Sequence, residues 1–347
     1  MFGFGTDYAG LAFWLPLIWA ALIAVAVVMY VVMDGFVLGV GIQFNAARDE
    51  NWRDRMMLSV APVWDGNQTW LVLGGGGLFA VFHLAYAILL PALYVPLLVM
   101  LIALIFRGVA FEFRFKAETS KRLWDYSFHY GSLAATFAQG MVLGAFVQGF
   151  AVSGRQFAGG TWDFLTPFSL MTGASLVLGY GLLGATWCVM KTTGDLELWA
   201  RRTALRFLVG VILAMGIVSL WVPFLGRDIE VRWFSWPNIV YLAPVPVITV
   251  FTAWRLYRAL EDGLTYRPFL LAIALFLLGY LGLGISLFPY IVPPQLTIWQ
   301  AANTVHSQLF ALVGFAIILP IMLGYTTYAY WVFRGKVAED VQASAYH

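Results

Sequence analysis

The sequence predicts an all-α, polytopic integral membrane protein: one transmembrane helical domain over residues 1–347 with nine membrane-spanning helices. Three observations predict it. Hydrophobic residues make up 61% of the chain and charged residues only 11%, whereas a soluble domain is about one quarter charged. Long apolar runs recur along the whole chain, and its Lys and Arg residues gather in alternate connections. Too few charges are present to cover a soluble globule, and the apolar content excludes disorder.

The apolar runs are separated by short breaks that carry charges, Gly or Pro. The N-terminus lacks the basic region of a signal peptide, and its apolar run is far longer than a signal peptide needs, so this run is taken as the first span. Each run is near or above the roughly 20 residues that cross a bilayer. The first is long enough to tilt or to project into the cytoplasm. The predicted spans are 10–44, 54–80, 84–113, 123–149, 164–190, 201–223, 238–260, 268–290 and 304–332.

The distribution of basic residues is an independent check on this count. With the N-terminus outside, the alternating connections place 17 of the 20 Lys and Arg residues inside, and leave Arg155, Arg227 and Arg232 outside. Cytoplasmic loops of membrane proteins carry such an excess. The pattern predicts an odd number of spans, an outer N-terminus and a cytoplasmic C-terminus. The longest outer connection, 224–237, holds charges and two Trp residues and is predicted to be an amphipathic interfacial segment.

Composition also restricts the chemistry. A net charge of +2 provides no basic field for nucleic acid, so no nucleic-acid partner is expected. The single cysteine, Cys188, permits neither an internal disulfide nor a thiolate metal cage. His129 and His306 are predicted near opposite faces of the membrane, so they cannot together ligate one haem. The connections are too short for a soluble catalytic domain. We expect no metal site and no catalytic side chain in this chain.

Two carboxylates are predicted deep inside spans. Asp34 and Asp65 each lie on the order of 15 Å from the inner end of a helix, and a charge there costs several kcal/mol unless it has a function or a partner. Such a pair suits a proton pathway, because a buried carboxyl can exchange protons with a file of water. Gln68 and Thr69 share a helical face with Asp65, and this face is expected to point at protein. The alternative is that both acids only bond neighbouring helices.

Several further residues predict local structure. Pro62 should kink the second span. Residues 74–77 are four consecutive glycines, which predict close backbone approach or a broken helix but no phosphate loop. Arg107 and Glu112, five residues apart, do not face each other on one helix and are equally well read as interfacial anchors. Pairs of glycines four apart predict close helix contacts: Gly35 with Gly39, and Gly140 with Gly144.

Four sequence blocks carry a family resemblance. They are residues 34–41, 61–71, 75–80 and 106–114, which read DGFVLGVG, APVWDGNQTWL, GGGLFA and FRGVAFEFR. Together they resemble subunit II of the cytochrome bd-type quinol oxidases, a family that includes the cyanide-insensitive oxidases. The resemblance runs essentially end to end, and the WDGNQ block carries most of its specificity.

The resemblance implies a membrane enzyme complex. Its core is a heterodimer of two nine-span subunits in the bacterial inner membrane, often with a very small accessory subunit. Subunit I carries haems b and d, or b alone, and oxidises ubiquinol or another quinol. Subunit II carries no haem but can hold a bound quinone. The complex reduces O2 to water with cytoplasmic protons, and is electrogenic without pumping.

The resemblance also implies roles for individual residues. Asp65 matches an acidic position on a proposed proton route, and Asp34 is its companion. Trp70 matches an aromatic residue that lines a proposed oxygen route. Val37 stands where some members carry a second acid, which argues against a proton route that depends on that acid. The outer connection 224–237 is short, so a quinone contact there is not carried over.

Two other functions stay open. One is a proton-coupled secondary transporter, in which the midmembrane carboxylates, Pro62 and the glycines at 74–77 mark a broken-helix substrate site. Against it, the sequence has no evident inverted repeat and few polar groups to bind a substrate. The other is a scaffold in which Asp34 and Asp65 are purely structural.

Overall fold

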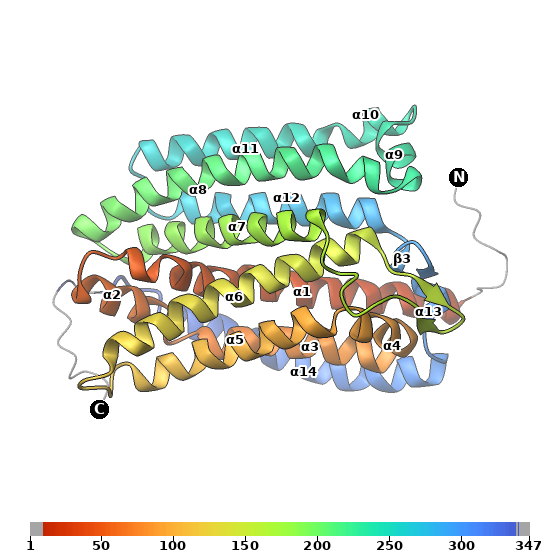
Figure 1. The fold of residues 1–347 in the computed structure, drawn as a ribbon, viewed down its shortest axis with the longest axis horizontal. Helices are drawn as coiled ribbons and strands as arrows, with labels where there is room; N and C mark the ends of the chain where they lie inside the picture. Colours follow the sequence, from red (N-terminus) through yellow and green to blue (C-terminus); the bar gives the residue numbers. More distant parts are fainter. Residues whose placement is uncertain (1–9, 338, 340–347) are drawn as a thin grey trace.

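The protein is a bundle of long helices that lie along one common axis (Figure 1). The computed structural model describes residues 10–337 and 339. The helices are α1 (Leu11–Gln43), α2 (Glu50–Val60), α3 (Trp64–Val81), α4 (His83–Ala92), α5 (Tyr94–Phe113), α6 (Lys121–Gln148), α7 (Pro167–Lys191), α8 (Gly194–Trp221), α9 (Arg227–Phe234), α10 (Asn238–Leu242), α11 (Pro244–Glu261), α12 (Arg267–Leu287), α13 (Ile298–Ala301) and α14 (Val305–Val332), with short 3-10 turns η1 (Phe44–Ala46) and η2 (Val222–Leu225).

Two short antiparallel hairpins complete the described structure. Strands β1 (Val152–Ser153) and β2 (Gln156–Phe157) pair with Val152 opposite Phe157. Strands β3 (Tyr290–Val292) and β4 (Leu296–Thr297) pair with Tyr290 opposite Thr297. The second hairpin lies at the end of the bundle where α1 begins (Figure 1).

Eight helical segments of the described residues are long and apolar enough to cross a membrane. They correspond to the first predicted span and to the third through ninth. The second, 54–80, is divided between α2 and α3, which are separated by a turn at 61–63. The first turns of α3 are rich in polar residues, which lowers the mean hydropathy of this helix. An all-α polytopic membrane protein is therefore confirmed, while the ninth crossing stays a prediction.

The breaks in the helices follow their residues. Pro62 lies in the turn between α2 and α3, so the predicted kink is a full interruption. A second interruption at Phe82 separates α3 from α4. The glycines at 74–77 are helical throughout, so the broken-helix expectation for them is wrong. Close approach holds at Gly77, where an added Cβ would lie 3.1 Å from Ile23 of α1, whereas Gly75 and Gly76 meet nothing within 4 Å.

The core is centred on the crossing of α1 with α7. A Cβ added to Gly39 would lie 1.8 Å from the carbonyl oxygen of Tyr180, and one added to Gly184 would lie 2.2 Å from the carbonyl carbon of Gly39. The two backbones therefore touch. Gly140 on α6 meets Thr172 of α7 in the same way. The close contacts predicted from the small-residue spacing are confirmed.

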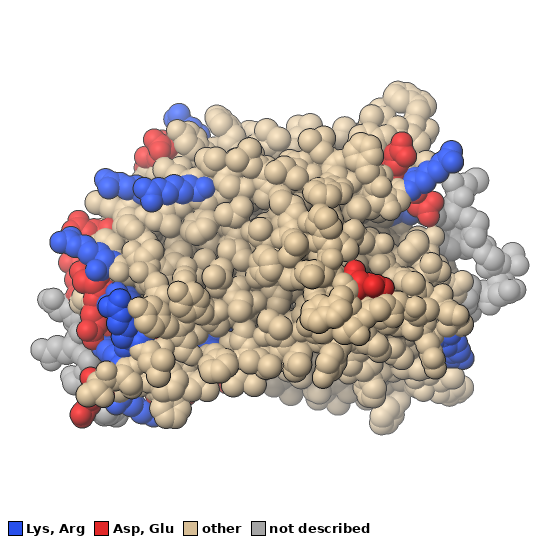
Figure 2. Space-filling model, viewed as in Figure 1, with Lys and Arg blue, Asp and Glu red and all other residues tan. Residues whose placement is uncertain are grey.

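Charged side chains gather at the two ends of the bundle and leave an apolar belt between them (Figure 2). The end that carries α2 holds a buried ionic cluster. Arg114, which is fully buried, contacts Asp54 and Asp125 at 2.5 Å each. Lys121 at the start of α6 pairs with Glu50, and this hydrogen bond holds the pKa of Glu50 below its ordinary value. The cluster fastens α2 against the ends of α5 and α6.

The connection between α8 and α11, predicted to lie outside, forms η2, α9 and α10. Asp228 and Glu230 of α9 are exposed, whereas Ile229 between them is buried. Arg232 Nη1 donates to the carbonyl oxygen of Ile285 at 2.7 Å, which attaches α9 to α12. Trp236 is 80% exposed. This pattern agrees with the predicted amphipathic segment.

Candidate functional site

A fully buried ion pair lies inside the bundle. Asp34 of α1 and Arg107 of α5 are both 0% exposed, and Arg107 Nη1 donates to Asp34 Oδ1 at 2.6 Å. Gly131 of α6 makes room for this arrangement, because a Cβ there would lie 3.0 Å from the backbone nitrogen of Arg107. The interpretation of Arg107 as an interfacial anchor is wrong. Its spacing from Glu112 gave no signal, since its partner is 73 positions away.

The pair is packed from the α3 side by an aromatic ring. The guanidinium carbon of Arg107 lies 5.8 Å from the ring centre of Trp64, which stacks on Phe111 at 4.8 Å. The quadrupole of the indole favours a cation over its face. Glu112, in contrast, is exposed and sits 3.9 Å from Lys116, as an interfacial residue would.

A chain of polar side chains continues from Asp34 across α6 to α7. Gln139 Nε2 donates to the Tyr30 hydroxyl at 2.7 Å, and the Tyr180 hydroxyl donates to Gln139 Oε1 at 3.0 Å. Tyr30 precedes Asp34 by one helical turn, so both lie on one face of α1. Sequence reasoning missed Tyr30, Gln139 and Tyr180. The i, i+4 spacing of Tyr30 and Asp34 was the available signal.

Asn67 is a further residue that sequence reasoning missed. It is 2% exposed, its Nδ2 donates to the carbonyl oxygen of Met33 at 2.8 Å, and its Oδ1 accepts from the Tyr330 hydroxyl at 3.0 Å. It therefore links α3 to α1 and α14 next to Asp34. A polar residue two positions after Asp65 lies on the opposite side of the helix, and that was the signal.

Asp65 does not join Asp34. Asp65 and Thr69 are exposed on the outer face of α3, Gln68 beside them is half-buried, and Val72 on the same side is 74% exposed. Within this chain the buried face of α3 is the one that carries Asn67, so the expectation that the Asp65 face points at protein stays a prediction about a partner subunit. The two carboxylates thus occupy different environments, one paired inside the bundle and one on its surface.

Trp70 is completely buried. It packs in an apolar cluster with Ala26, Tyr30 and Met33 of α1, against α14 residues that include Met322. Trp70 therefore lies between the interior of the bundle and the exposed face of α3.

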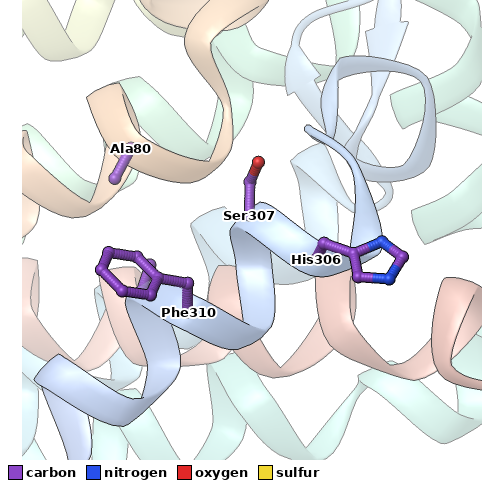
Figure 3. A pocket seen from close by; sticks show the side chains of 5 residues that line it. Ala80, His306, Ser307 and Phe310 are labelled. Carbon is purple, nitrogen blue, oxygen red and sulfur yellow. The ribbon is translucent and has the colours of Figure 1, made fainter.

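The two lone histidines lie apart. His129 Nδ1 is 3.0 Å from the carbonyl oxygen of Gly41, which satisfies one ring nitrogen. His306 is at the rim of a shallow open hollow that is also lined by Ala80, Ser307 and Phe310, and its ring points away from Phe310 (Figure 3). Among residues 10–337 and 339, no group of three or more His, Cys, Asp or Glu side chains could hold a metal ion.

Comparison with known proteins decides the family. The sequence model of the cytochrome bd terminal oxidase subunit II family matches residues 15–333. The chain belongs to this family. Family members include the cytochrome bd-I ubiquinol oxidase subunit 2 of Escherichia coli, 28% identical over 98% of this chain and 99% of that protein. The cytochrome bd ubiquinol oxidase subunit 2 of Bacillus subtilis is also 28% identical, over 92% of this chain and 96% of that one.

The fold of this subunit II agrees with that assignment. It is similar to a chain in the structure of the bd oxidase from Geobacillus thermodenitrificans, with a TM-score of 0.76 and 18% identity over 92% of this chain and 98% of that chain. The family match spans the helices that carry Asp34, Asp65 and Arg107. The resemblance stated from the sequence blocks is confirmed: the chain is a multi-pass subunit of a terminal oxidase.

Proposed function

We propose that this chain is the haem-free subunit II of a quinol:O2 oxidoreductase in a bacterial inner membrane, and that it supports a haem-bearing subunit I. The observation that carries the proposal is the family match over residues 15–333, with end-to-end relatives named ubiquinol oxidase subunit 2. Haems b and d, or b alone, would lie in subunit I, which would oxidise the quinol. A small accessory subunit and a quinone bound in this chain stay predictions of the resemblance.

We include nine crossings in the proposal, with the N-terminus outside. Trp19 near the start of α1 donates to the carbonyl oxygen of Gln308 near the start of α14. Lys191 at the end of α7 bonds to the carbonyl oxygen of Gly335, just beyond the end of α14, at 3.2 Å. The described chain thus starts at one end of the bundle and finishes at the other, which supports an odd number of crossings. The Lys and Arg excess supports a cytoplasmic C-terminus.

The face formed by α3 and α14 is the proposed contact with subunit I. α14 is mostly exposed along its apolar length. Asp65 lies on this side of α3, where Tyr325 of α14 flanks Gly66, so that a Cβ added there would lie 2.9 Å from the Tyr325 ring. A carboxylate that faced hydrocarbon would cost several kcal/mol. A protein partner over this face would remove that cost.

The proposed contribution to the reaction is access for substrates. Asp65, with Gln68 beside it and Asp34 behind it, would supply protons to the oxygen-reducing haem of subunit I. An oxygen route past Trp70 needs only apolar surroundings, because O2 dissolves in the membrane interior. The apolar cluster around Trp70 supports that placement.

A visible spectrum tests the assignment. The chain would be purified through a C-terminal tag in mild detergent, and reduced-minus-oxidised spectra recorded before and after the partner is stripped away. Haem bands that disappear with the partner support a haem-free subunit of an oxidase. Haem retained by the isolated chain would refute the haem-free assignment. Complete absence of haem, together with solute uptake by the isolated chain in liposomes, would favour the transporter.

Asp65→Asn separates proton access from a scaffold role. Turnover of the assembled oxidase should fall sharply while its haem content stays normal. Glu112→Gln is the matched control, because Glu112 is an exposed carboxylate at the end of α5 with only a long contact to Lys116. Equal turnover of Asp65→Asn, Glu112→Gln and the unmodified complex would leave Asp65 with a structural role only.

A further inference from the structure

The hydrogen bonds between Tyr180, Gln139 and Tyr30 have a fixed direction. The amide nitrogen of a glutamine can only donate and its amide oxygen can only accept. The Tyr180 hydroxyl therefore donates to Gln139 Oε1, and Gln139 Nε2 donates to the oxygen of Tyr30. Because the Tyr30 oxygen accepts from Gln139, its own hydrogen is available to another acceptor.

Asp34 offers an acceptor for this hydrogen on the same face of α1. Its Oδ1 accepts from Arg107 at 2.6 Å, whereas its Oδ2 is buried and has no hydrogen-bond partner among the described residues. Tyr30 is one turn away on the same helix face, and its hydroxyl interacts with this carboxyl. A buried carboxylate oxygen is stabilised by a donor and is costly without one.

The surroundings determine which form of Asp34 is favoured. The ionisable groups that face it are Arg107 from α5, Tyr30 from its own helix, Tyr180 from α7 and Tyr330 from α14. Gln139 of α6, which bonds to Tyr30, and Asn67 of α3, which bonds to the carbonyl oxygen of Met33, are neutral. Arg107 is always protonated and is completely buried. Protonation of Asp34 would therefore leave an uncompensated cation inside the bundle.

We propose that Tyr30, oriented by Gln139 and Tyr180, is a positioning residue that keeps Asp34 ionised beside Arg107. Asp34 then serves the proton route as a fixed negative charge, and Asp65 is the group that carries the proton. This assignment of roles deepens the proposed function and rests on it. The proposed ionised state of Asp34 does not depend on the proposed function, because it rests on the contact with Arg107 and on the Tyr30 chain.

Infrared spectroscopy of the assembled oxidase at neutral pH tests the ionisation state. The spectrum of Asp34→Asn subtracted from that of the unmodified complex isolates the Asp34 carboxyl. Carboxylate bands without a protonated-carboxyl band are expected. In a Tyr30→Phe background, the same subtraction should show a protonated-carboxyl band, with the ratio of protonated to ionised Asp34 increased about tenfold or more.

Tyr280→Phe is the matched control. The Tyr280 hydroxyl also donates to α1, at the carbonyl oxygen of Ala24, 3.1 Å away, but it is not part of the chain that ends on Asp34. This substitution should leave the Asp34 bands unchanged. Gln139→Leu should have an effect in the same direction as Tyr30→Phe, and it replaces that variant if Tyr30→Phe does not assemble.

Two results would overturn the inference: a protonated Asp34 in the unmodified complex, or Tyr30→Phe and Gln139→Leu spectra that match Tyr280→Phe. A failure of the proposed function is distinguishable from either. Full turnover of both Asp34→Asn and Asp65→Asn would reject proton access through these acids. The protonated-carboxyl band of Asp34 in Tyr30→Phe would still be expected, because it does not depend on turnover.

Discussion

Substitution of Gly39 by alanine should destabilise the subunit strongly, although it adds only one methyl group. The added Cβ would lie 1.8 Å from the carbonyl oxygen of Tyr180 and 2.7 Å from the backbone nitrogen of Gly184. Both are backbone atoms of α7, so no side chain can rotate away. Since ordinary contacts need about 3.5 Å, α1 and α7 would have to separate locally by roughly 1.5 Å.

The magnitude follows from two opposing contributions. Alanine is favoured over glycine in a helix by about 1 kcal/mol. Overpacking a close-packed interior costs typically about 1–3 kcal/mol, occasionally more, and a backbone clash lies at the upper end of that range. We expect the free energy of unfolding to fall by about 2 kcal/mol net. Separation of α1 from α7 should also disturb Asp34, which lies five positions before Gly39.

The assay is thermal unfolding of the assembled oxidase in detergent, monitored through the fraction of haem that the complex retains. Gly216→Ala in α8 is the matched control, because a Cβ there meets nothing within 4 Å and α8 is not part of the face proposed to contact subunit I. It should be neutral or slightly stabilising through helix propensity alone. Gly184→Ala, whose Cβ would lie 2.2 Å from the carbonyl carbon of Gly39, should resemble Gly39→Ala. A melting temperature for Gly39→Ala that equals that of Gly216→Ala would refute the contact argument.

Three further predictions concern charge and access. Arg107→Leu should lower the free energy of unfolding by about 3–5 kcal/mol, because it leaves Asp34 buried and unpaired. The double variant Arg107→Leu with Asp34→Leu should recover much of that loss. Thermal unfolding measures both, and a double variant no more stable than Arg107→Leu alone would contradict the prediction. The Lys121 hydrogen bond lowers the pKa of Glu50 from 4.5. Its stabilisation of α2 is therefore complete above that value and lost as pH falls through the lowered pKa, a loss that hydrogen exchange in α2 should detect and that Glu50→Gln should abolish. Trp70→Ala should change the KM for O2 with little change in haem content, and an unchanged KM would exclude an oxygen route there.

Some features of the fold and the candidate site could be predicted from the sequence, and others could not. A close helix contact of α1 was readable from Gly35 and Gly39, because small residues four apart lie on one helix face whatever packs against it. The break at Pro62 was readable because proline lacks the backbone donor that a helix needs there. Neither inference required knowledge of a neighbouring helix.

The environments of the two acids were not readable in this way. Periodicity places Asp65, Gln68 and Thr69 on one face but does not say which way that face turns. The rotation of α3 is decided by Asn67, which bonds to α1 and α14 and so directs Asp65 outward. The expectation of a paired relay between Asp34 and Asp65 therefore could not be settled by their depths alone.

Residue patterns alone were enough to predict an all-α membrane protein of the cytochrome bd terminal oxidase subunit II family. Hydropathy, charge placement and motif blocks are local properties of the chain, so they survive without a structure. The folded bundle was needed to show that Arg107 pairs with Asp34 and that Tyr30, Gln139 and Tyr180 form one chain. These contacts join α1, α5, α6 and α7, and they depend on the rotation and register of each helix against its neighbours. Both are fixed by the packing of the whole bundle, which no single segment encodes.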